Sequence, residues 1–280
     1  RDRSPSRGLG DVYKRQATEL ADKGVRELIL VAQETTVYGK DLYGKKSLHI
    51  LLKKLCEIRG IRWIRILYCY PEEIYDELIE TIRDEKKICH YLDIPIQHAS
   101  DRILKRMGRR TSKQELIDII GKLRKEIPDI VLRTTLITGF PGETEEDHEE
   151  LKEFVDEMEF DRLGVFTYSP EENTPAAEMA DQVPEEVKEE RRDELMELQQ
   201  EISYDRGQDR IGQELLVMIE GKVADESAYI GRTYGDAPKV DGYIFVQTGE
   251  LLMTGDFAKV RVTGALEYDL IGVLSDEYTE

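Results

Sequence analysis

Short apolar runs alternate with amphipathic charged stretches along residues 17–168. The apolar runs predict strands at residues 26–32, 63–68, 91–94, 130–138 and 163–167. The stretches between them predict helices near residues 47–58, 71–83, 112–126 and 145–158. Ser47 and Ser112 stand where helix N-caps belong, and Pro71 suits a first helical turn. Strands that alternate with helices predict a parallel α/β sheet covered by helices.

The pattern changes after residue 180. A charged helix is predicted over residues 185–203, with Val187, Leu195, Leu198 and Ile202 on one face. From Gly212 on, short alternating runs are separated by glycine and aspartate turns: QELLVMIEG, SAYIGRTY, YIFVQ, FAKVRVTGA and YDLIGVL. This pattern predicts a small all-β barrel.

Composition narrows the function classes. The 280 residues carry a formal net charge of -19, so the surface offers no general attraction to nucleic acid or to anionic membranes. No apolar run reaches the roughly 18 residues that a membrane span needs. The 3 cysteines are widely spaced and argue against a disulfide framework. We therefore expect a soluble protein of the reducing cytoplasm.

The first sixteen residues, RDRSPSRGLGDVYKRQ, differ from the rest of the chain. They hold five basic and two acidic residues, whereas residues 17–280 hold 35 basic and 57 acidic ones. No apolar core follows the arginines, so the stretch is no secretory signal. We interpret residues 1–16 as a foreign or disordered tail.

Polar or glycine- and proline-rich segments follow each predicted strand. They read AQETTVYG, CYPEE, PIQHAS, GFPGE and YSPEENTP in chain order. In parallel sheets, ligands gather at the carboxyl ends of the strands. The segment LITGFPGETEED is the most informative of these. Its glycines lack a side chain that would block a ligand, and Glu143 and Thr144 can cap the next helix. An ordinary strand-to-helix turn is the alternative.

Longer segments resemble the radical S-adenosylmethionine methylthiotransferases. The similarity lies in AQETTVYG, LYCYPEEI, DIPIQHASDRILKRMGRRT, LITGFPGETEED and VFTYSPEENTPAA. GRTYGDAPKVDGYIFV is similar to the branch that modifies an aspartate of ribosomal protein number twelve of the small subunit. The resemblance covers residue 17 to the C-terminus. It implies a partial TIM-type barrel that lacks its first strand, with a linker helix, over residues 17–203, and a TRAM β-barrel over residues 204–280.

The resemblance also implies S-adenosylmethionine as the ligand at the strand ends. Its predicted contacts are Glu34, Gln97, Ser100, Arg110, Arg133, Gly139, Gly142 and Tyr168.

Each contact has an expected role. Glu34 would accept hydrogen bonds from the ligand ammonium, oriented by its neighbours Gln33 and Thr35. Arg110 or Arg133 would hold the ligand carboxylate. The alternative for each is an ordinary polar residue in a loop or at a helix end.

The remaining contacts concern adenosine. Gln97 and Ser100 are candidates for the ribose hydroxyls, and Tyr168 offers adenine an aromatic surface. Each of them can instead be an ordinary loop or core residue. His98 has no other histidine at ligand spacing and is not expected to bind a metal.

The family also needs a CxxxCxxC loop, whose thiolates hold a 4Fe-4S cluster. Cys56, Cys69 and Cys89 lie too far apart to form it and are interpreted as buried apolar residues. The resemblance also implies a second cluster domain, which we do not expect in this chain. We therefore expect a truncated chain with no catalytic or metal-binding residues, which neither reduces S-adenosylmethionine nor donates sulfur.

The net charge of the predicted barrel distinguishes between the possible substrates. Residues 204–280 hold 15 acidic and 7 basic side chains, which disfavours the sister branch that modifies adenosine in transfer RNA. An acidic barrel suits a basic ribosomal protein, with Asp236 and Asp241 as expected contacts. Turn-forming aspartates are the alternative. A non-catalytic module that binds a ribosomal protein or RNA remains a second functional hypothesis.

Overall fold

The computed structural model describes residues 5–224 and 226–275, which divide into two compact units. The first unit contains the chain up to residue 69, residues 73–92, and the chain from residue 204 on. The second unit contains residues 70–72 and 93–203. The boundary expected between residues 203 and 204 is therefore one of several crossings between the units.

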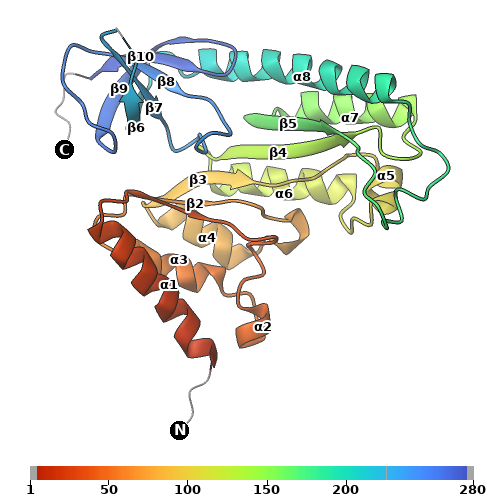
Figure 1. The fold of residues 1–280 in the computed structure, drawn as a ribbon, viewed down its shortest axis with the longest axis horizontal. Helices are drawn as coiled ribbons and strands as arrows, with labels where there is room; N and C mark the ends of the chain where they lie inside the picture. Colours follow the sequence, from red (N-terminus) through yellow and green to blue (C-terminus); the bar gives the residue numbers. More distant parts are fainter. Residues whose placement is uncertain (1–4, 225, 276–280) are drawn as a thin grey trace. The chain divides into compact units, whose positions relative to one another are not determined.

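The predicted parallel strands are all present. They are β1 (Glu27–Leu30), β2 (Trp63–Ile66), β3 (Ile88–Asp93), β4 (Val131–Thr138) and β5 (Arg162–Thr167) (Figure 1). Their order in the sheet is β1-β2-β3-β4-β5. All residues of β2 are buried, as expected for a parallel strand with both faces covered. The expected α/β partial barrel is confirmed.

The helices between the strands largely match the predictions. They are α3 (Leu48–Cys56), α4 (Asp76–Asp84), α6 (Lys113–Glu126) and α7 (Glu145–Met158). Ser112 caps α6 in a capping box with Glu115. Ser47 precedes α3, but its hydroxyl donates to Lys45 O (3.0 Å) and does not cap the helix.

The helix predicted over residues 71–83 is wrong in its first turn. Pro71 lies in a separate 3-10 turn, η1 (Pro71–Glu73), and α4 begins at Asp76. Tyr75 separates the two elements in extended conformation, which ends one helical segment before the next begins.

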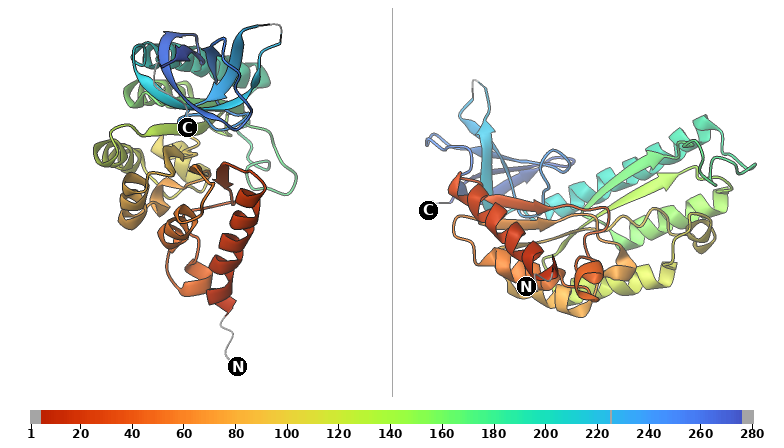
Figure 2. Two further views of the ribbon diagram at one scale, coloured as in Figure 1. Left: turned by 90° about the vertical axis from the view of Figure 1, so that its left-hand side faces the viewer. Right: turned by 60° about the horizontal axis from the view of Figure 1, so that its bottom comes forward.

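Three helices were not predicted: α1 (Pro5–Asp22), α2 (Lys40–Tyr43) and α5 (Asp101–Arg106). Residues 5–16, expected to be a foreign or disordered tail, belong to α1, and residues 1–4 lie outside the described residues. α1 lies beside α3 (Figure 2). Tyr13 meets Tyr38 edge to face, with 6.2 Å between ring centroids, and Asp11 pairs with Lys54 (3.2 Å). The foreign origin of this stretch stays a prediction.

After the parallel sheet comes α8 (Glu185–Gln208), which buries Leu195 and Ile202 as predicted. A closed barrel in the order β10-β8-β7-β6-β9 follows. Its strands are β6 (Glu214–Lys222), β7 (Ala228–Arg232), β8 (Ile244–Gln247), β9 (Phe257–Ala265) and β10 (Leu270–Leu274). Valine, isoleucine, alanine and leucine side chains, with the ring of Tyr229, fill its core. The predicted small barrel is confirmed.

Buried ion pairs fasten this barrel to the parallel strands of the first unit. Glu27 of β1 accepts from Arg65 Nε (2.8 Å) and from Arg232 Nη2 (2.6 Å), and Arg232 also pairs with Glu220 (2.7 Å). The side chains of Arg65 and Arg232 are 0% and 2% exposed. We call Glu27, Arg65, Glu220 and Arg232 the Glu27 network. The barrel, β1, β2 and β3 up to Leu92 lie in the same compact unit.

Candidate functional site

The loop between β4 and α7 has a backbone conformation that favours glycine at two positions. Gly139 and Gly142 have φ angles of 69° and 82°, a left-handed conformation that favours glycine. Thr144 caps α7 in a capping box with Asp147, as predicted for Thr144. Glu143 is not a cap, because its Oε2 turns back to accept the Gly139 N–H (2.9 Å).

Side chains of the protein itself occupy the space above both glycines. A Cβ at Gly139 would collide with Lys188, and a Cβ at Gly142 would collide with Asp181 and Arg106. The absence of a side chain therefore first makes room for neighbouring parts of the second unit. Binding of a cofactor by these glycines stays a prediction.

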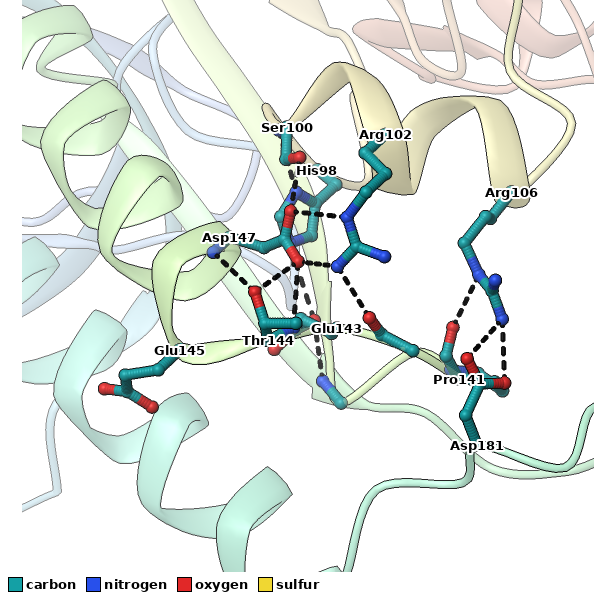
Figure 3. A network of polar contacts seen from close by, with 12 residues as sticks. His98, Ser100, Arg102, Arg106, Pro141, Glu143, Thr144, Glu145, Asp147 and Asp181 are labelled. Atoms are coloured by element: carbon teal, nitrogen blue, oxygen red, sulfur yellow. Dashed lines mark hydrogen bonds and ion pairs between the residues drawn. The ribbon is translucent and has the colours of Figure 1, made fainter.

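Arginines of α5 also hold this loop (Figure 3). Arg102 Nη2 donates to Gly142 O (2.6 Å) and pairs with Asp147. Arg106 donates to Pro141 O (3.0 Å) and pairs with Asp181 (2.8 Å). Two carbonyls of the loop thus have fixed cationic partners, which also pair with carboxylates of neighbouring segments.

Ser100 contributes to this anchorage. Its hydroxyl donates to Asp147 Oδ1 (2.7 Å), and the side chain is buried. Burial raises the pKa of Asp147, but hydrogen bonds from Arg102, Thr144 and Ser100 outweigh burial, so the net pKa is well below its ordinary value. Ser100 retains capacity to accept a hydrogen bond, so its predicted ribose contact stays a prediction.

Glu143 is the most buried carboxylate of the loop. Its Oε1 accepts from Arg191 Nη1 (2.9 Å), and His98 Nε2 lies 3.4 Å from its Oε2. Burial raises the pKa of Glu143, but His98, the Gly139 N–H and Arg191 together lower it below its ordinary value. We call His98, Gly139, Glu143 and Arg191 the Glu143 network.

Gln97 and Tyr168 flank the end of β4. Gln97 forms a parallel bridge with Leu136, and Tyr168 N donates to Thr138 O (2.8 Å). The buried side-chain atoms Gln97 Oε1 and Tyr168 OH have no hydrogen-bond partner among the described residues. Buried polar atoms without a partner are uncommon, so these two fit a polar ligand that completes them.

The two candidate arginines differ in surroundings. Arg133 lies near the start of β4, donates to Asp93 Oδ1 (2.8 Å) and contacts Thr135, so its guanidinium already has partners away from the strand end. Arg110 is exposed just before α6. The structure does not bring Arg133 to the end of β4.

Glu34 follows β1 in the first unit. Its carboxylate accepts the Thr36 N–H (2.9 Å) and contacts the Thr36 hydroxyl, whereas Thr35 donates to Leu67 O (2.6 Å). The predicted orienting role of Thr35 is therefore wrong, and Thr36 has that role. Glu34 lines a largely apolar cavity of about 750 Å³ beside β1.

Asp236 and Asp241 of the small barrel have internal partners. Asp236 Oδ2 accepts from Thr233 Oγ1 (2.7 Å), and Asp241 Oδ2 accepts from Tyr91 OH (2.7 Å) and Ala237 N (2.9 Å). Asp236 is buried. Both side chains therefore shape their loop, and their contact with a partner protein stays a prediction.

The cysteines do not fit a cluster. Cys69 and Cys89 are buried and Cys56 is half-buried, which confirms two of the three expected apolar positions. Burial raises the pKa of Cys56 to about 12 and that of Cys89 to about 11, which disfavours thiolates. Within residues 5–224 and 226–275, no group of three or more histidine, cysteine or acidic side chains could hold a metal ion. Nor does any helix in the described part have the length and apolarity to cross a membrane.

Comparison with known proteins identifies the family. The radical SAM superfamily matches residues 10–155, and a TRAM domain matches residues 211–274. The chain belongs to the radical SAM superfamily. The expected resemblance is thereby confirmed.

Curated relatives share one name. "Ribosomal protein uS12 methylthiotransferase RimO" of Lachnoclostridium phytofermentans is 67% identical over 257 residues, 92% of this chain and 58% of the relative. The protein of the same name from Clostridium perfringens is 54% identical over 272 residues, 97% of this chain and 60% of the relative. The chain thus spans about three fifths of the curated relatives it matches.

A solved structure shares the fold at low identity. Coproporphyrinogen III oxidase (HemN) from Escherichia coli, described as a radical SAM enzyme, aligns with a TM-score of 0.57 and 16% identity. The alignment covers 93% of this chain and 61% of that one. It supports the fold alone.

The sequence indicated the glycine loop but not the side chains from α8 that contact it. Lys188 and Arg191 come from α8, far along the chain, and only packing reveals that they are buried. A usable signal was present, because both basic residues interrupt the acidic run of α8 three positions apart and so share one helix face.

Proposed function

We propose that this chain is part of an enzyme that adds a methylthio group to an aspartate of ribosomal protein uS12. The identity of 67% over 257 residues to a protein named for that reaction carries the proposal. When bound, S-adenosylmethionine and an iron-sulfur cluster supply radical chemistry at an unactivated carbon. In this proposal, the residues of this chain bind S-adenosylmethionine and orient it.

The cofactor contacts are proposed at the strand ends. Glu34, held by Thr36, accepts from the ligand ammonium. Gln97 Oε1 and Tyr168 OH bind polar groups of the adenosine, since neither atom has a partner in the described chain. Arg110 suits the ligand carboxylate better than Arg133, because Asp93 already neutralises the latter.

Iron-sulfur ligation is not proposed for the described residues. The cysteines are separate, two are buried, and raised thiol pKa values oppose metal binding by Cys56 and Cys89. We therefore expect no 5'-deoxyadenosine when the purified chain is incubated with iron, sulfide, S-adenosylmethionine and a strong reductant. Its formation above a reaction without protein would contradict this expectation.

The partner is proposed to be a basic ribosomal protein. The acidic balance of residues 204–280 favours encounter with a cation-rich surface and disfavours RNA. Asp236 and Asp241 remain the proposed contacts. Replacing both by asparagine should weaken binding of uS12, provided that the unfolding midpoint shows a folded barrel; unchanged affinity would remove these residues from the interface.

Calorimetric titration of S-adenosylmethionine into the chain tests the cofactor proposal. Saturable binding is expected, with loss in Glu34→Ala and retention in Glu80→Ala, an exposed carboxylate of α4 in the same unit. Absence of binding to the unaltered chain would overturn the proposed cofactor site. Equal binding by both variants would exclude Glu34 from it.

A further inference from the structure

Groups from three separate segments of the second unit contact the buried carboxylate of Glu143. Gly139 N–H donates from the end of β4 (2.9 Å), and Arg191 donates from α8 (2.9 Å). His98 approaches from the segment before α5 with Nε2 at 3.4 Å. The side chains of His98 and Glu143 are both 0% exposed, so water does not compete for these contacts.

The proton position on His98 follows from its other nitrogen. Ser100 N–H donates to His98 Nδ1 (2.9 Å), which makes Nδ1 an acceptor. In the neutral imidazole the proton then resides on Nε2, the nitrogen that faces Glu143. His98 Nε2 has no hydrogen-bond partner among the described residues, and the Glu143 carboxylate at 3.4 Å is the acceptor it faces. The Ser100 amide thus selects the tautomer that can donate to the carboxylate.

The contact between His98 and Glu143 joins two segments that each carry proposed cofactor residues. Gln97 immediately precedes His98 and has a positive φ of 72°. Its backbone is held by Thr135 O (3.0 Å) and Ile137 N (2.9 Å) of β4. On the other side, the carboxylate of Glu143 holds the N–H of Gly139.

We propose that His98 is a positioning residue, which fixes the loop of residues 139–143 relative to Gln97 through the carboxylate of Glu143. The proposal deepens the proposed function, because that loop and Gln97 form part of the proposed S-adenosylmethionine site. His98 touches no proposed ligand atom. Its effect passes through the carboxylate that sets the direction of the Gly139 N–H.

Two substitutions separate the functions of the two ring nitrogens. His98→Asn supplies an acceptor near Nδ1 but does not reach Glu143, whereas His98→Gln supplies an amide donor near Nε2 and no acceptor for Ser100 N–H. His49→Asn, at a half-buried histidine in the first unit, is the matched control. Amide hydrogen exchange of the four non-proline residues in 139–143 is the readout besides binding, with protection of α6 as the check of folding.

We expect the amides of Gly139, Phe140, Gly142 and Glu143 to exchange about tenfold faster in His98→Asn, with α6 unchanged, because a buried polar contact to a charged group is lost. The Kd for S-adenosylmethionine should rise about tenfold as well. His98→Gln should stay within about threefold of the unaltered chain in both readouts, and His49→Asn should match it.

Equal protection of the loop in His98→Asn and the unaltered chain would overturn the positioning role. Equal damage by asparagine and glutamine would also overturn it, since the donor to Glu143 would then be irrelevant. If the unaltered chain binds no S-adenosylmethionine, the proposed cofactor site fails. The exchange comparison still decides the role of His98 in that case.

Discussion

The Glu27 network and the Glu143 network place a buried carboxylate among polar and cationic partners in two different ways. Glu27 connects β1 with Arg232 of the small barrel, a residue far along the chain. Glu143 instead folds back onto Gly139, a near neighbour, and takes Arg191 as its distant partner. The first network ties a domain to a sheet, whereas the second sets the shape of a loop.

The difference predicts where each network acts. Losing the charge of Glu27 leaves the guanidinium groups of Arg65 and Arg232 buried between packed elements, so folding of the whole first unit should suffer. Losing a partner of Glu143 leaves β4 and α7 with their own backbone hydrogen bonds and cap. Damage to the second network should therefore be more local.

The largest effect is expected for Glu27→Gln. The amide keeps the shape but removes the charge that compensates Arg65 and Arg232, so the free energy of unfolding should fall by about 3–5 kcal/mol. Urea titration followed by far-UV circular dichroism measures it. Glu214→Gln is the control, because Glu214 forms an exposed pair with Lys259 (4.0 Å) in the barrel and should cost under about 1 kcal/mol. Similar losses in both variants would contradict the distinction.

A glycine pair separates backbone conformation from crowding in the second unit. Gly108 and Gly139 have φ angles of 74° and 69°, but only Gly139 has a side chain, that of Lys188, where a Cβ would stand. Gly108→Ala should cost about 1–2 kcal/mol for its left-handed backbone. Gly139→Ala should cost about 1–3 kcal/mol more for overpacking. Equal urea midpoints would show that Lys188 moves aside without penalty.

Acid should weaken the anchorage of the glycine loop through Asp147. Its pKa is lowered in the folded protein, so its stabilising effect is complete above the ordinary value near 3.9 and is lost as the pH falls toward the folded value. At pH 7, Asp147→Asn should reduce stability by about 1–3 kcal/mol. This difference should shrink progressively below about pH 4.

Urea midpoints measured between pH 7 and pH 3 test the pH dependence. Glu153→Gln, at an exposed position of the same helix, provides the comparison and should change stability little at any pH. A difference between Asp147→Asn and the unaltered chain that stays constant with pH would exclude a charge effect.

Periodicity predicted the strands because a parallel sheet and a closed barrel both require regular burial along each strand. It could not predict the polar networks, whose members come from separate elements, such as Glu27 with Arg232 or Glu143 with Arg191. α5 was missed because Asp101–Arg106 is too short to show a helical period. The proposed role of Asp241 rested on charge alone, and the structure adds a hydrogen bond from Tyr91 that charge counting cannot foresee.

The smallest effect is expected for Tyr91→Phe, a substitution beside the Glu27 network of the first unit. Tyr91 packs on Arg65, with the guanidinium 4.6 Å from the ring centre, and its hydroxyl donates to Asp241 (2.7 Å). Phenylalanine keeps the stacking and removes one hydrogen bond, so stability should fall by only about 1 kcal/mol. Tyr91→Leu removes the aromatic face as well and should cost more, because Arg65 then loses its cation–π contact inside the protein. If the two variants have equal urea midpoints, the ring contributes nothing to the Glu27 network.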